Sequence, residues 1–208
     1  MVESDNWRSD LLNDNNFEQV VPFSYETITF HLEKTNQDLD NLNPFSLLRA
    51  IWEITKAFKS LSSALAIGFS DITSKVNVWR DNFKNLYTSE TTMNEVLAKE
   101  ISLGIHKCNG DNNSKLGFKK GSPYANYVSS TRTLLRLSWF LDFMNNIIKI
   151  SCEKEDKSFS DCIKLSYDIA LGPHHPFLVR KGAQIGINFA PSKREKAMKA
   201  FFGNNNIC

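Results

Sequence analysis

Long apolar runs are missing from this sequence of 208 residues, and none approaches the roughly 20 residues that a helix needs to cross a bilayer. We therefore expect any contact with a membrane to be peripheral. A dominant sign of charge is missing as well: the formal net charge is +2, which argues against a general nucleic-acid binder. The GxSxG, P-loop, HExxH and Rossmann fingerprints are also absent, so no such motif points to an enzyme or to a bound cofactor.

Cysteine is scarce, and its spacing is not that of a metal site. The four cysteines form no CxxC motif: Cys108, Cys152, Cys162 and Cys208. We therefore expect no metal. The N-terminal stretch MVESDNWRSDLLNDNN is polar and acidic, unlike a secretory signal. This predicts a cytoplasmic protein, transiently present at membrane surfaces, whose thiols stay reduced.

Apolar residues recur at helical spacing, with no strand pattern and no internal repeat. The clearest stripe steps by three and four: Leu65, Phe69, Ile72, Val76, Trp79, Phe83 and Leu86. Further helices are expected at 26–39, at 45–61, after a cap at Ser89 or Thr91, at 127–150, at 158–171, after Pro176 and at 192–202, with a loop at 108–123. The sequence therefore predicts an all-α protein, in which residues 1–40 form an N-terminal extension and 41–208 the main domain.

The most apolar of these helices, at 127–150, carries apolar side chains on nearly every face, which is typical of a helix buried between two layers. Arg132 and Arg136 interrupt it, one helical turn apart. A guanidinium fork pairs bidentately with phosphate, at about 1.5–3 kcal/mol for each charge-assisted bond. This spacing therefore indicates an anion site, although two arginines on a solvated face remain the ordinary alternative.

A second pair of charges, Asp71 and Lys75, lies at the edge of the apolar stripe with the same spacing. An exposed ion pair is the competing interpretation, and it contributes only about 0.3–0.5 kcal/mol. As a site, the carboxylate of Asp71 suits a ligand that offers an amide N–H and a hydroxyl, while Lys75 supplies a compact cation for a phosphate oxygen. The pair therefore fits an anionic ligand with an amide next to its head group.

Two histidines, His174 and His175, stand immediately before Pro176. A histidine near a helix start is usually a capping or core residue, and that alternative stays open. Together with the two charged pairs, His175 completes a set of three cations, one carboxylate and one imidazole among apolar helices. Charge against apolar surface is costly unless it is neutralised, so the set predicts a ligand that is anionic at one end and hydrocarbon at the other.

These segments, in this order, resemble the motifs of the glycolipid transfer protein family, and specifically of its ceramide-1-phosphate-binding branch. The family carries a D-x-x-x-[NK] pair on one helix, head-group residues on a later helix, and a His before a Gly/Pro-aromatic sequence. The corresponding residues here are Asp71 with Lys75, Arg132 with Arg136, and His175 with Pro176 and Phe177. The resemblance runs from about Pro44 to Phe202 and implies a two-layer helical sandwich that encloses an apolar lipid pocket.

The resemblance also implies a ligand. Glycolipid carriers of this family have Asn where Lys75 stands and a sugar-stacking Trp where Arg136 stands, so this chain is expected to transfer ceramide-1-phosphate without any chemistry. By the same resemblance Asp71 orients the ceramide, His175 bonds the acyl amide oxygen, and the three cations hold the phosphate. The alternatives are glycosphingolipid transfer, a sphingolipid sensor acting through a protein partner, and a hydrolase on a helical scaffold.

Membrane contact is predicted for two aromatic residues and two basic segments. Phe177 takes the place of the Trp that the family usually has after the His, and Trp79 is a second candidate, although its place on the apolar stripe favours the core. The basic segments 118–121 and 193–199 either lie on solvated faces or contact anionic lipid. The family normally has another long helix after the segment that ends at residue 202, and in this respect the sequence departs from the family pattern.

Overall fold

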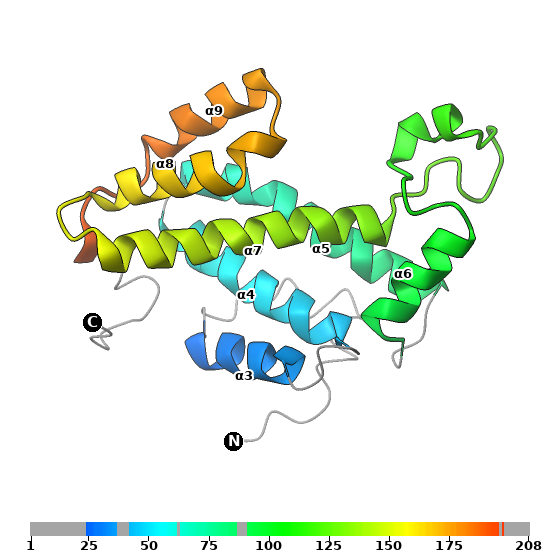
Figure 1. Cartoon of the computed structure of the whole chain (residues 1–208), viewed down its shortest axis with the longest axis horizontal. Helices are drawn as coiled ribbons and strands as arrows, with labels where there is room; N and C mark the ends of the chain where they lie inside the picture. The colour runs from blue at the N-terminus through cyan, green and yellow to red at the C-terminus, as the bar shows by residue number, and fades with distance from the viewer. Residues whose placement is uncertain (1–23, 37–41, 62, 87–90, 196, 198–208) are drawn as a thin grey trace. The chain divides into compact units, whose positions relative to one another are not determined.

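The computed structural model describes residues 24–36, 42–61, 63–86, 91–195 and 197, without the side chains of 59–61, 63–68, 84–86, 111 and 112. Figure 1 shows the helices within these ranges: α3 (Tyr25–Asn36), α4 (Pro44–Leu61), α5 (Ser63–Leu86), α6 (Met93–Ser102), η1 (Gly110–Leu116), α7 (Ser130–Glu153), α8 (Phe159–Ala170), η2 (Gly172–His174) and α9 (Phe177–Ile187). The only β-pairing in the described part is an isolated bridge between Asn109 and Val128. The predicted all-α class is confirmed.

The chain divides into two units, and α4, α5 and α7 each contribute to both. Of the described residues, those within 26–51 and 74–136 form the first unit, and those within 24–25, 52–73 and 137–197 form the second. These units do not test the predicted boundary at residue 40 between an N-terminal extension and the main domain, which stays a prediction.

Aromatic side chains build the core of each unit. In the first unit Phe83 meets Phe45 with ring centroids 4.6 Å apart and stacks on Trp79 at 5.6 Å. In the second unit Phe69 stacks on Phe58 at 4.3 Å and meets the edge of Phe140 at 5.6 Å. Fully burying one such side chain contributes about 1.5–3 kcal/mol. These contacts come from the α5 stripe that the sequence predicted.

The described members of that stripe, Phe69, Ile72, Val76, Trp79 and Phe83, are all buried, while the side chains of Leu65 and Leu86 lie outside the described residues. The predicted stripe is therefore confirmed where it can be followed. Trp79 has no exposed surface. Its candidacy for membrane contact is thus wrong, and its assignment to the core is confirmed.

Two helices begin at other residues than predicted, because hydrogen bonds of side chains determine where they start. The N-cap of α6 is Thr92, which forms a capping box with Glu95, so it is not the predicted Thr91, and Ser89 lies outside the described residues. The long helix α7 begins at Ser130, three residues later than predicted. The reason is that the carbonyls of Tyr127 and Val128 accept bonds from outside the helix.

The prediction that α7 is enclosed on nearly every face is wrong. Leu137, Phe140 and Ile147 are buried, but Leu135 and Ile148 are 53% and 56% exposed. Helix α7 has more apolar residues than its core-facing side can hold, so some of them lie at the surface.

The segment after α8 turns sharply, as the Gly172-Pro173 sequence predicted. It forms the short helix η2, and α9 starts after Pro176 and contacts α8. Figure 1 shows α9 on the far side of α8 from α7. Downstream, residues 194, 195 and 197 are helical, which agrees with the start of the helix predicted at 192–202, and the rest of that prediction lies outside the described residues.

Arg194 closes the other end of α7. Its guanidinium donates to the carbonyls of Ser151 at 2.6 Å, of Lys157 at 2.9 Å and of Lys154. A cation at a helix C-terminus also complements the helix dipole.

Acid should weaken the packing of α3 through His31. This imidazole is 1% exposed, and its burial, together with the charges of Arg49 and Lys34, lowers its pKa from 6.5 to about 4. As the pH falls, the unfolded state therefore takes up this proton first, and the native state loses about 2 kcal/mol between pH 7 and pH 5. Urea unfolding at both pH values measures this loss. In His31→Leu the free energy of unfolding should depend less on pH, because the contribution of the imidazole is removed. If the free energy of unfolding of the variant fell as much between pH 7 and pH 5 as that of the wild type, the loss would belong to other groups.

Candidate functional site

The strongest site feature is the pair Arg132 and Arg136 on α7, in the first unit. Both side chains are half-buried, and they stand one turn apart on the same helix face. Burial, and then the charge of Arg136, lowers the pKa of Arg132. Among the described residues the buried Nε of Arg132 has no hydrogen-bond partner, and neither guanidinium is paired with a carboxylate. The protein therefore leaves concentrated positive charge for an anion to neutralise.

A buried carboxylate fixes the start of α7 directly before this pair. Glu100 of α6 has no exposed surface, and its oxygens accept bonds from the backbone N–H groups of Ser130 at 2.7 Å and Thr131 at 2.8 Å. They also accept the hydroxyls of Tyr127 and Ser129, both at 2.6 Å. Burial alone would raise the pKa of Glu100, but these hydrogen bonds outweigh it and hold the pKa below its usual value.

The same cluster reaches the backbone of the first arginine, because the Ser129 hydroxyl accepts a hydrogen bond from the N–H of Arg132 at 3.0 Å. Glu100 was not among the site residues predicted from the sequence. The available signal was its place on the apolar stripe of α6, where it follows Met93 and Val96 at helical spacing. A carboxylate on such a stripe needs buried donors, and here the first turn of α7 supplies them.

Asn82 ties α5 to the same place in the first unit. Its side-chain amide donates to the carbonyl of Val128 at 2.9 Å and to the hydroxyl of Ser130 at 2.8 Å. Lys75 lies two turns earlier on α5 and is only 8% exposed, whereas Asp71 is exposed. The interpretation of these two residues as an exposed ion pair is therefore wrong for Lys75.

The histidines of the second unit have aromatic partners. The Nδ1 atom of His175 lies 2.8 Å from the hydroxyl of Tyr167 on α8. The ring of His174 stacks on Trp139 of α7, with centroids 3.8 Å apart and planes 5° apart. The turn that carries both histidines is thus held against α8 and against the second half of α7.

The five predicted site residues are divided between the units: Lys75, Arg132 and Arg136 belong to the first, and Asp71 and His175 to the second. The structure brings the two arginines together and places Asp71 and Lys75 on successive turns of α5. The convergence of all five around one ligand stays a prediction.

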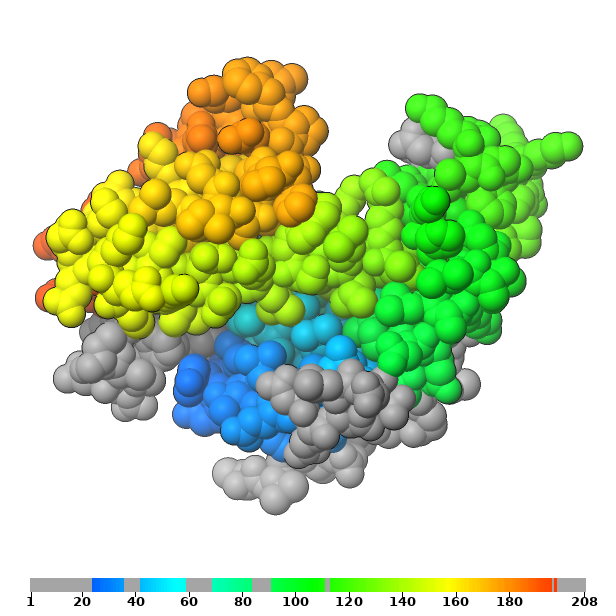
Figure 2. Space-filling view, in the orientation of Figure 1, coloured from blue at the N-terminus to red at the C-terminus, as the bar shows by residue number. Residues whose placement is uncertain are grey.

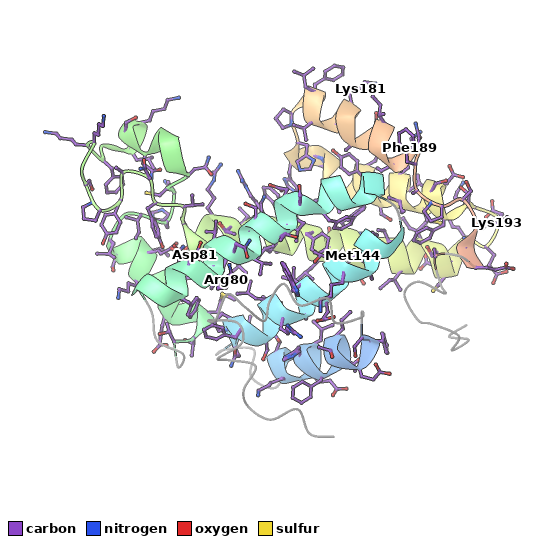
Figure 3. The ribbon with its side chains drawn as sticks, turned by 180° about the vertical axis from the view of Figure 1, so that it is seen from behind. Arg80, Asp81, Met144, Lys181, Phe189 and Lys193 are labelled. Carbon is purple, nitrogen blue, oxygen red and sulfur yellow. The ribbon has the colours of Figure 1, made fainter. Side chains whose placement is uncertain are left out.

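The helix α9 exposes more large apolar side chains than any other described segment. Phe177 is 70% exposed, Leu178 81% and Ile185 62%. Phe189, two residues beyond the end of the helix, is 66% exposed. The ammonium of Lys181 lies 5.6 Å from the centre of the Phe177 ring. Figure 2 shows α9 projecting from the surface beyond α8, and Figure 3 labels Lys181 on this helix and Phe189 just after its end. Membrane contact by Phe177 remains a prediction that this exposure supports.

Within the described ranges, the helices lack a stretch of the length and apolarity required to pass through a bilayer.

The described residues thus combine helices, an arginine pair without an ion-pair partner and an exposed apolar helix. The family model of the glycolipid transfer protein family matches residues 43–202, and the chain belongs to this family. Proteins of this family are lipid transfer proteins and not enzymes. The resemblance found in the sequence is therefore confirmed.

Solved structures share the fold at low sequence identity. Human ceramide-1-phosphate transfer protein, in complex with 12:0 ceramide-1-phosphate, superposes with a TM-score of 0.69 at 18% identity, covering 86% of this chain and 81% of that one. The Arabidopsis accelerated-cell-death 11 protein, as a mutant complexed with C12 ceramide-1-phosphate, gives 0.64 at 20% identity, with 85% and 79% covered. The fungal glycolipid transfer protein HET-C2 gives 0.59 at 18%, with 84% and 82% covered.

These neighbours confirm the fold and leave the lipid open, because they include complexes with ceramide-1-phosphate as well as a glycolipid transfer protein. Among curated protein sequences, none matches the chain significantly.

Proposed function

We propose that this protein binds ceramide-1-phosphate and carries it between membranes without chemical change. The observation that carries the proposal is the arginine pair of α7. Two half-buried guanidinium groups in one helical turn, one of them with an unbonded Nε and a lowered pKa, are destabilised unless an anion joins them. A phosphate monoester has the charge and the several acceptor oxygens that such a pair requires.

A sugar head group fits this chain less well. Sugars are bound by stacking on an open aromatic face, and the tryptophan nearest to the arginine pair along α7 is Trp139. One face of its ring is already covered by His174 at 3.8 Å. Lys75, Arg132 and Arg136 therefore support a phosphorylated sphingolipid over a glycosylated one.

The remaining contacts follow the chemistry of ceramide. In the proposal, Asp71 accepts hydrogen bonds from the amide N–H and the hydroxyl of the sphingoid base, and His175 donates to the acyl carbonyl. The hydrocarbon chains enter an apolar pocket among the helices. At about 0.8 kcal/mol for each methylene exposed to water, unassisted release of a two-chain lipid from a bilayer is very slow, so a protein that shields the chains accelerates exchange.

Membrane contact is assigned to α9. An amphipathic helix with exposed aromatic and aliphatic residues lies in the interface between head groups and acyl chains, and basic residues add attraction to anionic lipid. Phe177 and Leu178 on the helix, and Phe189 just after its end, supply the apolar part, while Lys181 supplies charge. In the proposal the protein is cytoplasmic and meets membranes transiently through this helix.

A vesicle-to-vesicle transfer assay tests the function. Fluorescent ceramide-1-phosphate and galactosylceramide of the same acyl chain are offered in donor vesicles, and the phosphorylated lipid should move at least about ten times faster, since one lost charge-assisted bond already corresponds to that factor. Faster transfer of galactosylceramide would contradict the assignment of the lipid. Tight binding without transfer would instead indicate a sensor that acts through a protein partner, and mass spectrometry of the recovered lipid should show no product.

A further inference from the structure

The hydroxyl of Tyr167 is placed to control His175. Tyr167 is 3% exposed, and its oxygen lies 2.8 Å from the Nδ1 atom of the imidazole. The two residues are held by a tight turn between α8 and α9. The N–H of Leu171 donates to the carbonyl of Tyr167 at 3.0 Å, and a Cβ atom at Gly172 would lie only 3.3 Å from the same carbonyl oxygen. The contact is therefore part of a close-packed turn.

The direction of this hydrogen bond follows from where the hydroxyl proton of Tyr167 can find an acceptor. Burial raises the pKa of Tyr167 and outweighs the opposite effect of Arg180, so the phenol keeps its proton at neutral pH. Among the described residues, the bond to His175 is the only hydrogen bond of this hydroxyl. If Nδ1 carried the hydrogen and donated it, the buried phenol O–H would be left without an acceptor, which is costly. The phenol therefore donates, and Nδ1 accepts.

A neutral imidazole that accepts at Nδ1 carries its hydrogen on Nε2. We infer that Tyr167 is a positioning residue that fixes His175 as the Nε2–H tautomer, so that His175 presents a hydrogen-bond donor to a carbonyl oxygen of the ligand. The identity of the ligand in this inference rests on the proposed function. The assignment of the tautomer does not, because it follows from the contact between Tyr167 and His175. It makes the pair a determinant of selectivity for N-acylated lipids over lipids without an acyl group.

The tautomer is measured in the lipid-free protein by ¹⁵N NMR of the histidine side chains. Wild-type His175 should show one species, with a protonated Nε2 and an Nδ1 that accepts a hydrogen bond. Tyr167→Phe deletes one oxygen atom and should give a mixture of the two tautomers. A protonated Nδ1 in the wild type, or an unchanged spectrum in the variant, would overturn the inference whatever lipid the protein binds.

The effect on selectivity is measured by comparing two lipids. Tyr167→Phe should weaken the binding of ceramide-1-phosphate about three- to ten-fold, the size of one neutral hydrogen bond, and leave sphingosine-1-phosphate unaffected, because that lipid has no acyl carbonyl. In a His175→Ala background the tyrosine substitution should have no further effect on either lipid. Equal losses for both lipids would show that Tyr167 acts only on the fold.

A matched control is Tyr127→Phe, which deletes a phenol oxygen bonded to Glu100 at 2.6 Å in the first unit. This variant should lose stability while the His175 spectrum and the ratio of the two lipid affinities stay unchanged. If neither lipid binds to the wild type, the proposed function fails, and the NMR result still decides the role of Tyr167.

Discussion

Arg132→Met should lower the affinity for ceramide-1-phosphate by a factor of about 100 to 1,000, and it should leave the lipid-free protein at least as stable as the wild type. The loss corresponds to about 3–4 kcal/mol for a bidentate contact of a guanidinium with phosphate. Stability is not expected to fall, because the charge of Arg132 is disfavoured by burial and by Arg136, while Met retains much of the apolar stem. Titration calorimetry and urea unfolding measure the two quantities.

Arg194→Met provides the contrasting control. The guanidinium of Arg194 donates to three backbone carbonyls at and beyond the end of α7, so its loss should lower the free energy of unfolding without changing lipid affinity. If Arg132→Met bound ceramide-1-phosphate as tightly as the wild type, the arginine pair would not be the phosphate site and the proposed function would lose its main support.

Glu100→Ala should strongly destabilise the first unit, with a loss of about 3–5 kcal/mol in the free energy of unfolding. It removes the acceptor of two backbone N–H groups, those of Ser130 and Thr131, and one partner of the hydroxyls of Tyr127 and Ser129, and each donor left unpaired costs about 1–3 kcal/mol before relaxation. The Ser129 hydroxyl keeps the carbonyl of His106, at 2.9 Å, as an acceptor. The folded-state pKa of Glu100 is lowered, so its contribution is complete above the unfolded pKa of about 4.5 and is lost as the pH falls through the folded value.

Urea unfolding of Glu100→Ala and of Glu95→Ala tests this. Glu95 also accepts a hydrogen bond from a backbone N–H, but it lies in the exposed capping box of α6, where the expected loss is about 1 kcal/mol. Similar losses for the two variants would show that the buried cluster is not the anchor of α7.

Helices were predictable because they depend on local periodicity. The steps of three and four along α5 placed its buried face, including the full burial of Trp79, and the Gly172-Pro173 sequence placed the turn before α9. Helix starts were less accessible. The start of α7 depends on Asn82 and on Asn113, which draw the carbonyls of Val128 and Tyr127 away from helical bonding, and these contacts span many residues.

The site could be predicted only in part, for the same reason. Helical spacing alone indicated that Arg132 and Arg136 share one face of α7. The partners that prepare the site come from other elements, since Glu100 reaches α7 from α6 and Tyr167 meets His175 across a turn. A single acidic or phenolic residue in a helical sequence does not reveal which neighbour will share its proton or its charge.

The backbone amides in the first turn of α7 are already hydrogen-bonded, and this affects how lipid selectivity can evolve at the proposed site. Many proteins capture phosphates with the free amides at a helix start, which recognise any anion and do not depend on side chains. Here the carboxylate of Glu100 already takes the amides of Ser130 and Thr131. In the proposed site these two amides are therefore not available to the phosphate, which would be held by side chains, so a change of head-group selectivity would require a few side-chain substitutions and no rebuilding of the backbone.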